Sequence, residues 1–425
     1  MGKLKAAVIG AGSTYTPELI EGFLEFGDEL PFDCISLMDI DEYRLNVVGS
    51  FARRQLRAGG YKGDIELVLD LDKAVYGSSF VFGQVRVGKM AARIRDEKIP
   101  LKYDLIGQET TGAGGFMKAL RTIPVVMNIA ETMKKSAADG AWLVNFSNPS
   151  GIVAEAVLNN TDVNMIGLCN CPINMLKEIG AAIGTDEFDY EYVGLNHLSW
   201  ITSISVPGSS ETLSRALMGG EGMKNVPKLD IDPGLLKAVP YIPSSYLSYF
   251  SYRDKQLEKC KKAEKTRGEI CLEVEEKLYS IFKDESVCTK PEEISQRGGS
   301  MYSTAAIKAV SSIYNDKGEY HVVDAKNKGA IPFMDDDDIV EVKCKLGKSG
   351  VVPQPVSPCN DFVVGLMRAV KAYEKLTVKA ALEGSYDAAL AALLVHPLIG
   401  DFEKAKGVLD EMLEANKEFV PQFFR

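Results

Sequence analysis

Two short segments of the chain carry residue types that bind metal ions. The first, IGLCNCPINM, places Cys169 and Cys171 on either side of Asn170, and the second, VGLNHLSW, contains His197, one of only three histidines. A thiolate and an imidazole together suit a borderline divalent metal. Because a turn at a strand end directs only one of two such cysteines into a cleft, we expect Cys171 to be the one that does not face it. Such residues are also common in apolar cores, so their spacing leaves both interpretations open.

A glycine-rich turn near the N-terminus predicts a nucleotide site. The segment GAGSTYTPEL follows an apolar run and opens a predicted helix, so its backbone N–H groups can receive a pyrophosphate. Tyr15 replaces the third glycine of the usual pattern, and two glycines alone are a weak signal. Asp39 ends the next apolar run, where a carboxylate accepts the ribose hydroxyls and favours NAD over NADP. The predicted cofactor-binding residues are Gly10, Gly12, Ser13, Thr14 and Asp39. A tight turn with Asp39 as a helix cap would give the same pattern without a nucleotide.

These residues require a sheet whose strands end at one edge. The apolar runs expected as strands are residues 4–9, 34–41, 66–69, 79–84, 141–146 and 164–168. Because they alternate with helical patterns, they predict a doubly wound parallel sheet. After about Tyr190, mixed strands and long helices such as Phe362–Leu382 indicate a different region. We therefore expect an α/β protein with an N-terminal Rossmann-like NAD domain (residues 1–168) and a mixed α+β C-terminal domain (residues 169–425).

The composition excludes several classes of protein. The 425 residues are 46% hydrophobic and 25% charged, and the net charge of −10 argues against a nucleic-acid surface. The eight cysteines have irregular spacings, which do not predict a disulfide framework. No apolar run approaches the ~20 residues of a membrane helix, and the N-terminus has no signal-peptide pattern. We expect a soluble, cytoplasmic protein that binds neither nucleic acid nor membrane.

Several longer motifs carry more information than these short patterns. They are VIGAGSTYTPEL, IPLKYDLIGQETTGAGGF, NFSNPSG, IGLCN, YVGLNHLSW and RGGSMYSTAA, and the helical tail LLVHPLIG follows them. Together they resemble glycoside hydrolase family 4, and most closely its 6-phospho-β-glucosidase branch. The resemblance implies a lactate/malate-dehydrogenase-like NAD domain, a divalent metal that is usually Mn²⁺, and a homodimer or homotetramer. It also implies cleavage of phosphorylated disaccharides or β-glucosides by oxidation at C3, elimination, water addition and re-reduction.

The resemblance assigns the reacting groups. Cys169 and His197 are the metal ligands, and the metal acidifies the C3 hydroxyl of the sugar. The base that removes the C2 proton is Tyr246, in AVPYIPSSYLSYF, and not Tyr241 or Tyr249. A phenol with a pKa near ~10 needs nearby positive charge to act as a base at neutral pH. Without the resemblance, this tyrosine-rich segment would be interpreted as core packing.

Arginines and amides are expected to hold the sugar phosphate. The candidates are Arg86, Asn148, Asn170, Arg267 and Arg297. Arginine suits phosphate because its planar fork donates two hydrogen bonds, although any one arginine can equally form a surface ion pair. In α-acting members of the family the position of Asn170 is an aspartate that serves as the acid. The amide here indicates a β-linkage and leaves the general acid unassigned.

Two other functions remain compatible with parts of the pattern. An NAD-dependent 2-hydroxy-acid dehydrogenase would also have the sheet, Asp39 and Arg86, but it relies on a His–Asp relay and would produce NADH. A non-catalytic module that binds NAD or a sugar phosphate would show no turnover. The joint presence of Cys169, His197 and Tyr246 argues against this second alternative.

Overall fold

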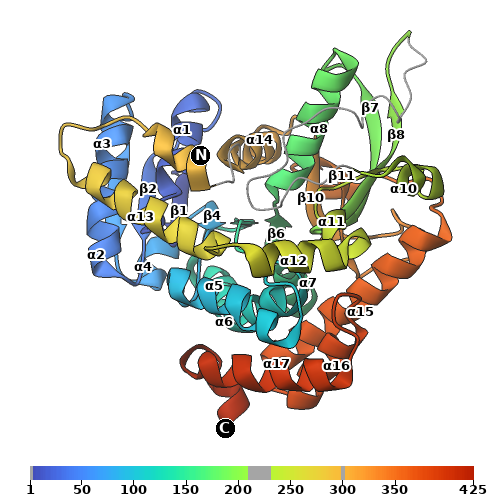
Figure 1. Cartoon of the computed structure of the whole chain (residues 1–425). Coiled ribbons are helices and arrows are strands. Elements are labelled where there is room, and N and C mark those ends of the chain that lie inside the picture. The colour runs from blue at the N-terminus through green and yellow to red at the C-terminus, as the bar shows by residue number, and fades with distance from the viewer. Residues whose placement is uncertain (1–2, 209–230, 298–301) are drawn as a thin grey trace.

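A mixed sheet, mostly parallel, runs through the middle of the molecule (Figure 1). The computed structural model describes residues 3–208, 231–297 and 302–425. In this part of the chain, nine strands form one sheet in the order β12-β11-β10-β6-β5-β4-β1-β2-β3. They are β1 (Lys5–Ile9), β2 (Cys34–Met38), β3 (Asp64–Val68), β4 (Phe80–Gly83), β5 (Trp142–Asn145), β6 (Asn164–Gly167), β10 (Glu319–Lys326), β11 (Ile339–Gly347) and β12 (Gly350–Pro353).

The first six strands confirm the predicted α/β fold. They are parallel and follow the order β3-β2-β1-β4-β5-β6, which is the order of dinucleotide-binding domains. Every predicted apolar run contains one of these strands or overlaps it. The central strands are apolar along their whole length because helices cover both of their faces. Ala6, Val8, Phe82 and Leu143, for example, have no exposed surface.

The C-terminal part of the chain extends this same sheet. Strand β10 pairs antiparallel with β6 through Asp324 and Gly167, and β11 and β12 continue antiparallel beyond it. The expected domain boundary at residues 168 and 169 lies between β6 and helix α8. A separate antiparallel sheet contains β7 (Asp189–Leu195), β8 (Leu198–Ser205) and β9 (Ile242–Pro243).

Helices cover the sheet on both sides (Figure 1). On one side α4 and α7 contact the strands and α6 contacts both helices, while α14 lies against β10 and β11 on the other side, next to α1. The helices are α1 (Thr16–Glu25), α2 (Glu42–Arg44), α3 (Ser50–Ala58), α4 (Leu71–Val75), α5 (Lys89–Lys98), α6 (Gly112–Ser136), α7 (Ser150–Asn160), α8 (Asn170–Ile183), α10 (Pro233–Ala238), α11 (Leu247–Ser251), α12 (Arg253–Lys262), α13 (Arg267–Lys283), α14 (Tyr302–Asn315), α15 (Asp361–Glu383), α16 (Tyr386–Val395) and α17 (Phe402–Ala415). None of the described helices is long and apolar enough to cross a membrane.

Candidate active site

A cavity of about 720 Å³ lies at the carboxyl ends of the parallel strands. Most of the predicted site residues line it, from both halves of the chain: Gly10, Ser13, Asp39, Arg86, Asn148, Asn170, His197, Tyr246 and Arg297. Gly12, Thr14 and Cys169 do not line the cavity but contact residues that do. Arg267 is not part of the lining, and its Nη2 donates to the carbonyl of Gln296 at 2.6 Å.

The glycine-rich turn at one end of the cavity accommodates only glycine at two positions. Gly10 has φ of +91°, and a Cβ there would lie 2.9 Å from the carbonyl oxygen of Gln84. The N–H of Gly12 donates to Asp39 Oδ2 at 2.8 Å, and a Cβ on Gly12 would lie 2.7 Å from the same oxygen. The residue that caps α2 is Asp41 rather than Asp39. The Asp39 carboxylate therefore lies against the turn and on the cavity wall, as a ribose acceptor requires.

Arg297 lies at this same end of the cavity. Its Nη1 donates to the hydroxyl of Thr14, and its guanidinium lies 5.2 Å from the centre of the Tyr15 ring. Glu275 on α13 accepts from Arg44 Nη2 at 2.6 Å and has Arg297 Nη1 at 3.8 Å. The structure thus places Arg297 beside the glycine-rich turn, whereas the sequence suggested it for the sugar phosphate.

Cys169 and His197 lie side by side at the other end. Cys169 caps α8, and its Sγ lies 3.6 Å from His197 Nε2. His197 occupies the turn between β7 and β8 with φ of +67°, in the left-handed region. The Cys171 sulfur instead contacts the sulfur of Met175 at 3.9 Å. Only one of the two cysteines therefore faces the histidine.

This pair fits a divalent metal ion. Metal bonds of about 2.3 Å to sulfur and about 2.1 Å to nitrogen can reach two atoms that are 3.6 Å apart. Burial, with a smaller effect of Lys118, lowers the pKa of His197 to about 3, so the imidazole is in the neutral form that binds metals. In the described ranges no three His, Cys, Asp or Glu side chains gather to hold an ion. Two protein ligands leave positions open for a substrate, as a catalytic site needs.

Tyr246 covers the imidazole. The two ring centres are 4.1 Å apart, and the tyrosine is 3% exposed. Burial raises the pKa of Tyr246 well above 10, the sulfurs of Cys169 and Cys171 add to this, and the Thr110 hydroxyl opposes it. A positive charge at the Cys169–His197 pair would lower it. Neither Tyr241 nor Tyr249 lines the cavity.

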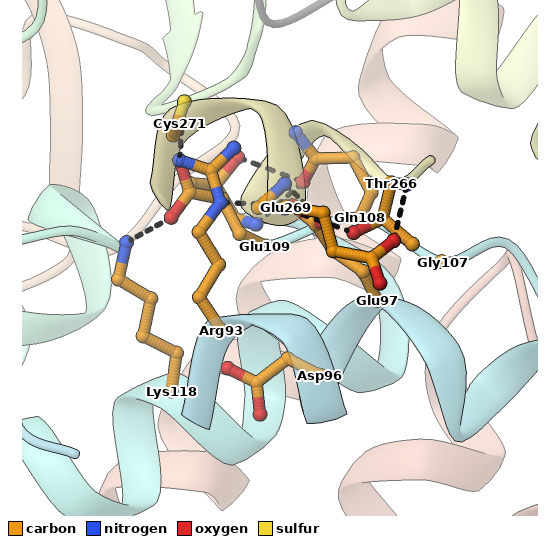
Figure 2. Close-up of polar contacts among 12 residues, drawn as sticks. Arg93, Asp96, Glu97, Gly107, Gln108, Glu109, Lys118, Thr266, Glu269 and Cys271 are labelled. Carbon is orange, nitrogen blue, oxygen red and sulfur yellow. Dashed lines mark hydrogen bonds and ion pairs between the residues drawn. The ribbon is translucent and has the colours of Figure 1, made fainter. Parts of the chain in front are cut away.

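A buried carboxylate gathers three cations beside this site, and two of them were missed in the sequence. Glu109 Oε2 accepts from Arg86 at 2.6 Å. The same oxygen accepts from Lys118 at 3.0 Å, and Glu109 Oε1 lies 3.0 Å from Arg93 (Figure 2). Burial opposes ionisation, but Arg86, Arg93 and Lys118 hold the pKa of Glu109 well below its usual range. A second carboxylate, Glu97, pairs with Arg93 at 2.8 Å. While Lys118 is protonated, the three cations outnumber the two carboxylates, and the excess positive charge attracts anions.

The sequence around Lys118 contains a signal that could have predicted its place in this cluster. It stands in the otherwise apolar segment FMKAL, where a lysine that is 4% exposed needs a specific partner. Burial lowers the pKa of Lys118 to about 7, which Glu109 opposes and Arg86 reinforces. Arg93 gave no such signal, because α5 contains several other charged residues.

Two amides complete the wall. Asn148 follows β5, at a cis peptide bond to Pro149, and Asn170 is the first residue of α8 after β6. Both line the cavity between the glycine-rich turn and His197. Neither amide can supply an acidic proton.

Comparison with known families agrees with this arrangement. Residues 5–185 match the sequence model described as family 4 glycosyl hydrolase, and residues 192–399 match the model of its C-terminal domain. The chain belongs to glycosyl hydrolase family 4. A probable 6-phospho-β-glucosidase of Bacillus subtilis (strain 168) is 41% identical to this family 4 enzyme over 434 residues, which cover 99% of this chain and 98% of the relative.

Solved structures of family 4 enzymes have the same fold as this chain over nearly its whole length. A 6-phospho-β-glucosidase from Thermotoga maritima, described with NAD and glucose 6-phosphate, has a TM-score of 0.90 at 36% identity and covers 98% of this chain and 99% of its own. The same enzyme, described with manganese, NAD⁺ and glucose 6-phosphate, has a TM-score of 0.89 at that identity and coverage. A malate dehydrogenase from Plasmodium falciparum, with a TM-score of 0.52 at 12% identity over 89% of this chain and 98% of its own, shows the fold alone.

Proposed function

We propose that this enzyme hydrolyses 6-phospho-β-glucosides with NAD⁺ and a divalent cation, Mn²⁺. The relatives described above carry this activity in their names, and the Thermotoga enzyme was solved with these groups. The observation that supports the proposal most strongly is the contact of Cys169, His197 and Tyr246 at one end of a cavity whose other end is a glycine-rich turn. A glycosidase that works with paired carboxylates needs neither of these features.

The glycine-rich turn would bind the dinucleotide. Gly10, Gly12, Ser13 and Thr14 stand at the N-terminus of α1, where backbone N–H groups favour a pyrophosphate. The carboxylate of Asp39 would accept the ribose hydroxyls and repel a 2′-phosphate. Arg297, which contacts Thr14, adds a positive charge beside the pyrophosphate.

Cys169 and His197 would hold the cation at the sugar end. NAD⁺ bound here would supply a reversible hydride acceptor for C3 of the sugar, and the cation would supply a Lewis acid for the sugar oxygens. Tyr246 lies against His197 and would take the C2 proton, which the neighbouring ketone makes acidic. The aglycone then leaves from C1, and water adds in its place. Asn170, next to Cys169, is an amide that fits a β-acting enzyme.

Arg86 and Lys118 would bind the 6-phosphate. Both line the cavity and both contact Glu109, which holds their charged groups in place. An arginine fork and an ammonium suit a dianion. Arg267, also expected from the sequence to bind the phosphate, lies outside the lining and would contribute less to phosphate binding than Arg86.

A 2-hydroxy-acid dehydrogenase is not favoured. That class needs a histidine oriented by a carboxylate, whereas the Nε2 of His197 faces a cysteine sulfur. The experiment that separates the two functions is a panel of nitrophenyl glycosides, with and without a 6-phosphate, supplied with NAD⁺ and Mn²⁺. We expect release of nitrophenol from the phosphorylated β-glucoside with no net NADH. Steady production of NADH from a hydroxy acid, without glycoside cleavage, would contradict the proposal.

We further propose that the protein is cytoplasmic and forms a homodimer or homotetramer. We also propose that residues 1–168 form the NAD-binding domain and residues 169–425 the domain for substrate, metal and oligomerisation. None of the eight cysteines, all of which lie in the described ranges, forms a disulfide, which fits a reducing compartment. Light scattering of the purified protein would give the oligomeric state, and a monomeric mass would contradict this part of the proposal.

A further inference from the structure

His396, in the LLVHPLIG segment, has no part in the reaction described above. It follows α16 and is 1% exposed. Its Nδ1 accepts a hydrogen bond from the N–H of Leu398 at 3.1 Å. Burial lowers the pKa of His396 to about 3, so the ring is neutral. Because Nδ1 is an acceptor in a neutral ring, the proton must be on Nε2.

The Nε2–H of His396 points to no protein acceptor. This atom is buried and has no hydrogen-bond partner in the described ranges. The ring is fixed by an edge-on contact with Tyr373, with centres 4.4 Å apart, and by a stacked contact with Phe250 at 6.1 Å. Since a buried donor that lacks an acceptor is strongly unfavourable, something else should accept this hydrogen bond.

A small cavity lies between His396 and His197. Its volume is about 20 Å³, and it is lined by both His396 and His197, with Thr110 and Glu374 among its other walls. Roughly 10–15 Å³ measured in this way is enough for one water molecule, provided that two to four polar groups surround it. The cavity meets both conditions.

The atoms around it are complementary to water. His197 Nε2 faces Cys169, so Nδ1 is the nitrogen on the far side of the ring. Nδ1 is buried and makes no hydrogen bond of ordinary geometry, although a looser hydrogen bond to the backbone carbonyl of Thr110 raises the pKa of the ring. The carboxylate of Glu374, held by Lys371 at 2.5 Å, provides an acceptor. One water can therefore accept from the two imidazole N–H groups and donate to Glu374.

We infer that a buried water links His197 Nδ1 to His396 Nε2, and that His396 is a positioning residue for the metal ligand His197. The linked water keeps the proton on Nδ1 of His197, which leaves the Nε2 lone pair directed at the cation. Partners of this kind orient metal-binding imidazoles and affect metal affinity. The inference rests on the metal site of the proposed function, but it does not depend on the substrate.

The test measures metal binding and structure rather than turnover. Mn²⁺ is titrated by calorimetry into chelator-treated wild type and His396→Phe, a variant that keeps an aromatic ring but removes the N–H. We expect the dissociation constant of Mn²⁺ to rise about tenfold or more, with NAD⁺ affinity unchanged. His396→Gln, whose amide can donate into the same cavity, should recover most of the loss. His321→Phe, at a partly buried histidine that lines neither cavity, should bind Mn²⁺ as the wild type does.

A high-resolution crystal structure of the wild type gives an independent result. We expect density for one water within hydrogen-bond distance of both imidazoles, and no such water in His396→Phe. A wild-type map without this water, or a His396→Phe variant with unchanged Mn²⁺ affinity, overturns the inference. If His396→Phe does not fold, the inference is tested by the wild-type electron density and by the Mn²⁺ affinity of His396→Gln. A protein that passes both tests but cleaves no phosphorylated glucoside would contradict only the proposed function.

Discussion

The Sγ of Cys169 lies 3.6 Å from the Nε2 of His197, although the two residues are 28 positions apart in the chain. One stands at the start of α8, after the last parallel strand, and the other in the turn between β7 and β8. The side chain of Asn196 fixes this turn, because its Oδ1 accepts from the N–H of Ser150 at 3.1 Å and its Nδ2 donates to Glu341 at 3.0 Å. The Cys169–His197 pair is thus held by the sheet and by buried hydrogen bonds.

Loss of either metal ligand should abolish turnover. Residues that only hydrogen-bond to a metal ligand typically change metal affinity or activity by ~10–100-fold when they are replaced. We expect Cys169→Ser and His197→Ala, which replace the ligands themselves, to lower the rate of turnover by more than this. NAD⁺ affinity, measured by calorimetry, should stay nearly the same, because the glycine-rich turn is at the other end of the cavity. Cys171→Ser is the matched control, since its sulfur contacts Met175 and not His197. Excess chelator should inactivate the wild type and Mn²⁺ should restore it; full activity in chelator would contradict the metal site.

The choice between NAD and NADP should depend on Asp39. Asp39→Asn removes the charge but keeps an oxygen that can accept from Gly12 N–H. We expect NAD⁺ affinity to fall roughly tenfold or more, because a charged hydrogen bond contributes ~1.5–3 kcal/mol, while NADP⁺ affinity rises. Asp41→Asn, at the cap of α2, should leave the ratio of the two affinities unchanged. An Asp39→Asn variant with the wild-type ratio would argue against ribose binding at this position.

The six-stranded parallel part of the sheet was predictable from the sequence, but the addition of β10, β11 and β12 to the same sheet was not. The parallel strands appeared as apolar runs because both faces of the sheet are buried. The junction of β10 with β6, through Asp324 and Gly167, left no local signal because it joins segments far apart in the chain. This pairing makes the C-terminal strands part of the first sheet, which the alternation of helix and strand does not reveal.

Arg86 should discriminate phosphorylated from unphosphorylated substrates. Arg86→Met removes a guanidinium that Glu109 holds at 2.6 Å on the cavity wall. We expect kcat/KM for the phosphorylated β-glucoside to fall roughly 10–100-fold, the equivalent of ~1.5–3 kcal/mol, and kcat/KM for the unphosphorylated one to change little. Arg267→Met is the comparison variant, because Arg267 lies outside the lining and should have the smaller effect. A larger loss in Arg267→Met would assign the phosphate to Arg267 instead.

Lys118 should make the binding of the phosphorylated substrate depend on pH. Its pKa is lowered to about 7 by burial, so the amine is charged below that pH and becomes neutral above it. We expect KM for the phosphorylated substrate to rise as the pH increases through this value. Lys118→Arg keeps the charge throughout and should flatten the rise, while the titration of the phosphate itself remains common to both enzymes. Identical KM profiles for the wild type and Lys118→Arg would contradict a role for this charge.

The motifs identified the centre of the site better than its surroundings. Cys169, His197 and Tyr246 occur in distinctive segments, and the structure brings them together. The partners of Glu109 lie on two helices, α5 and α6, whose side-chain directions depend on tertiary packing. Arginine positions were the least predictable, because sequence alone does not show which cavity end a long side chain reaches. Arg297 illustrates this, since it reaches Thr14 at the cofactor end.

Tyr246 should be required for the proton transfer at C2. Tyr246→Phe keeps the ring that lies against His197 but removes the hydroxyl. We expect a loss of turnover of at least ~100-fold, the scale of a positioned acid or base, with Mn²⁺ and NAD⁺ affinities close to those of the wild type. Tyr249→Phe, whose ring is 6.2 Å from that of Tyr246 but does not line the cavity, is the matched control. Near-normal turnover by Tyr246→Phe would exclude this tyrosine as the base.

The position of deuterium in the product tests the elimination route most directly. A glycosidase with paired carboxylates never breaks the C2–H bond, whereas elimination must remove that proton and water must later supply one. Wild-type enzyme with NAD⁺ and Mn²⁺ is allowed to cleave a 6-phospho-β-glucoside in D₂O, and the released glucose 6-phosphate is analysed by NMR. We expect deuterium at C2. Product that carries only protium at C2 would contradict the elimination route.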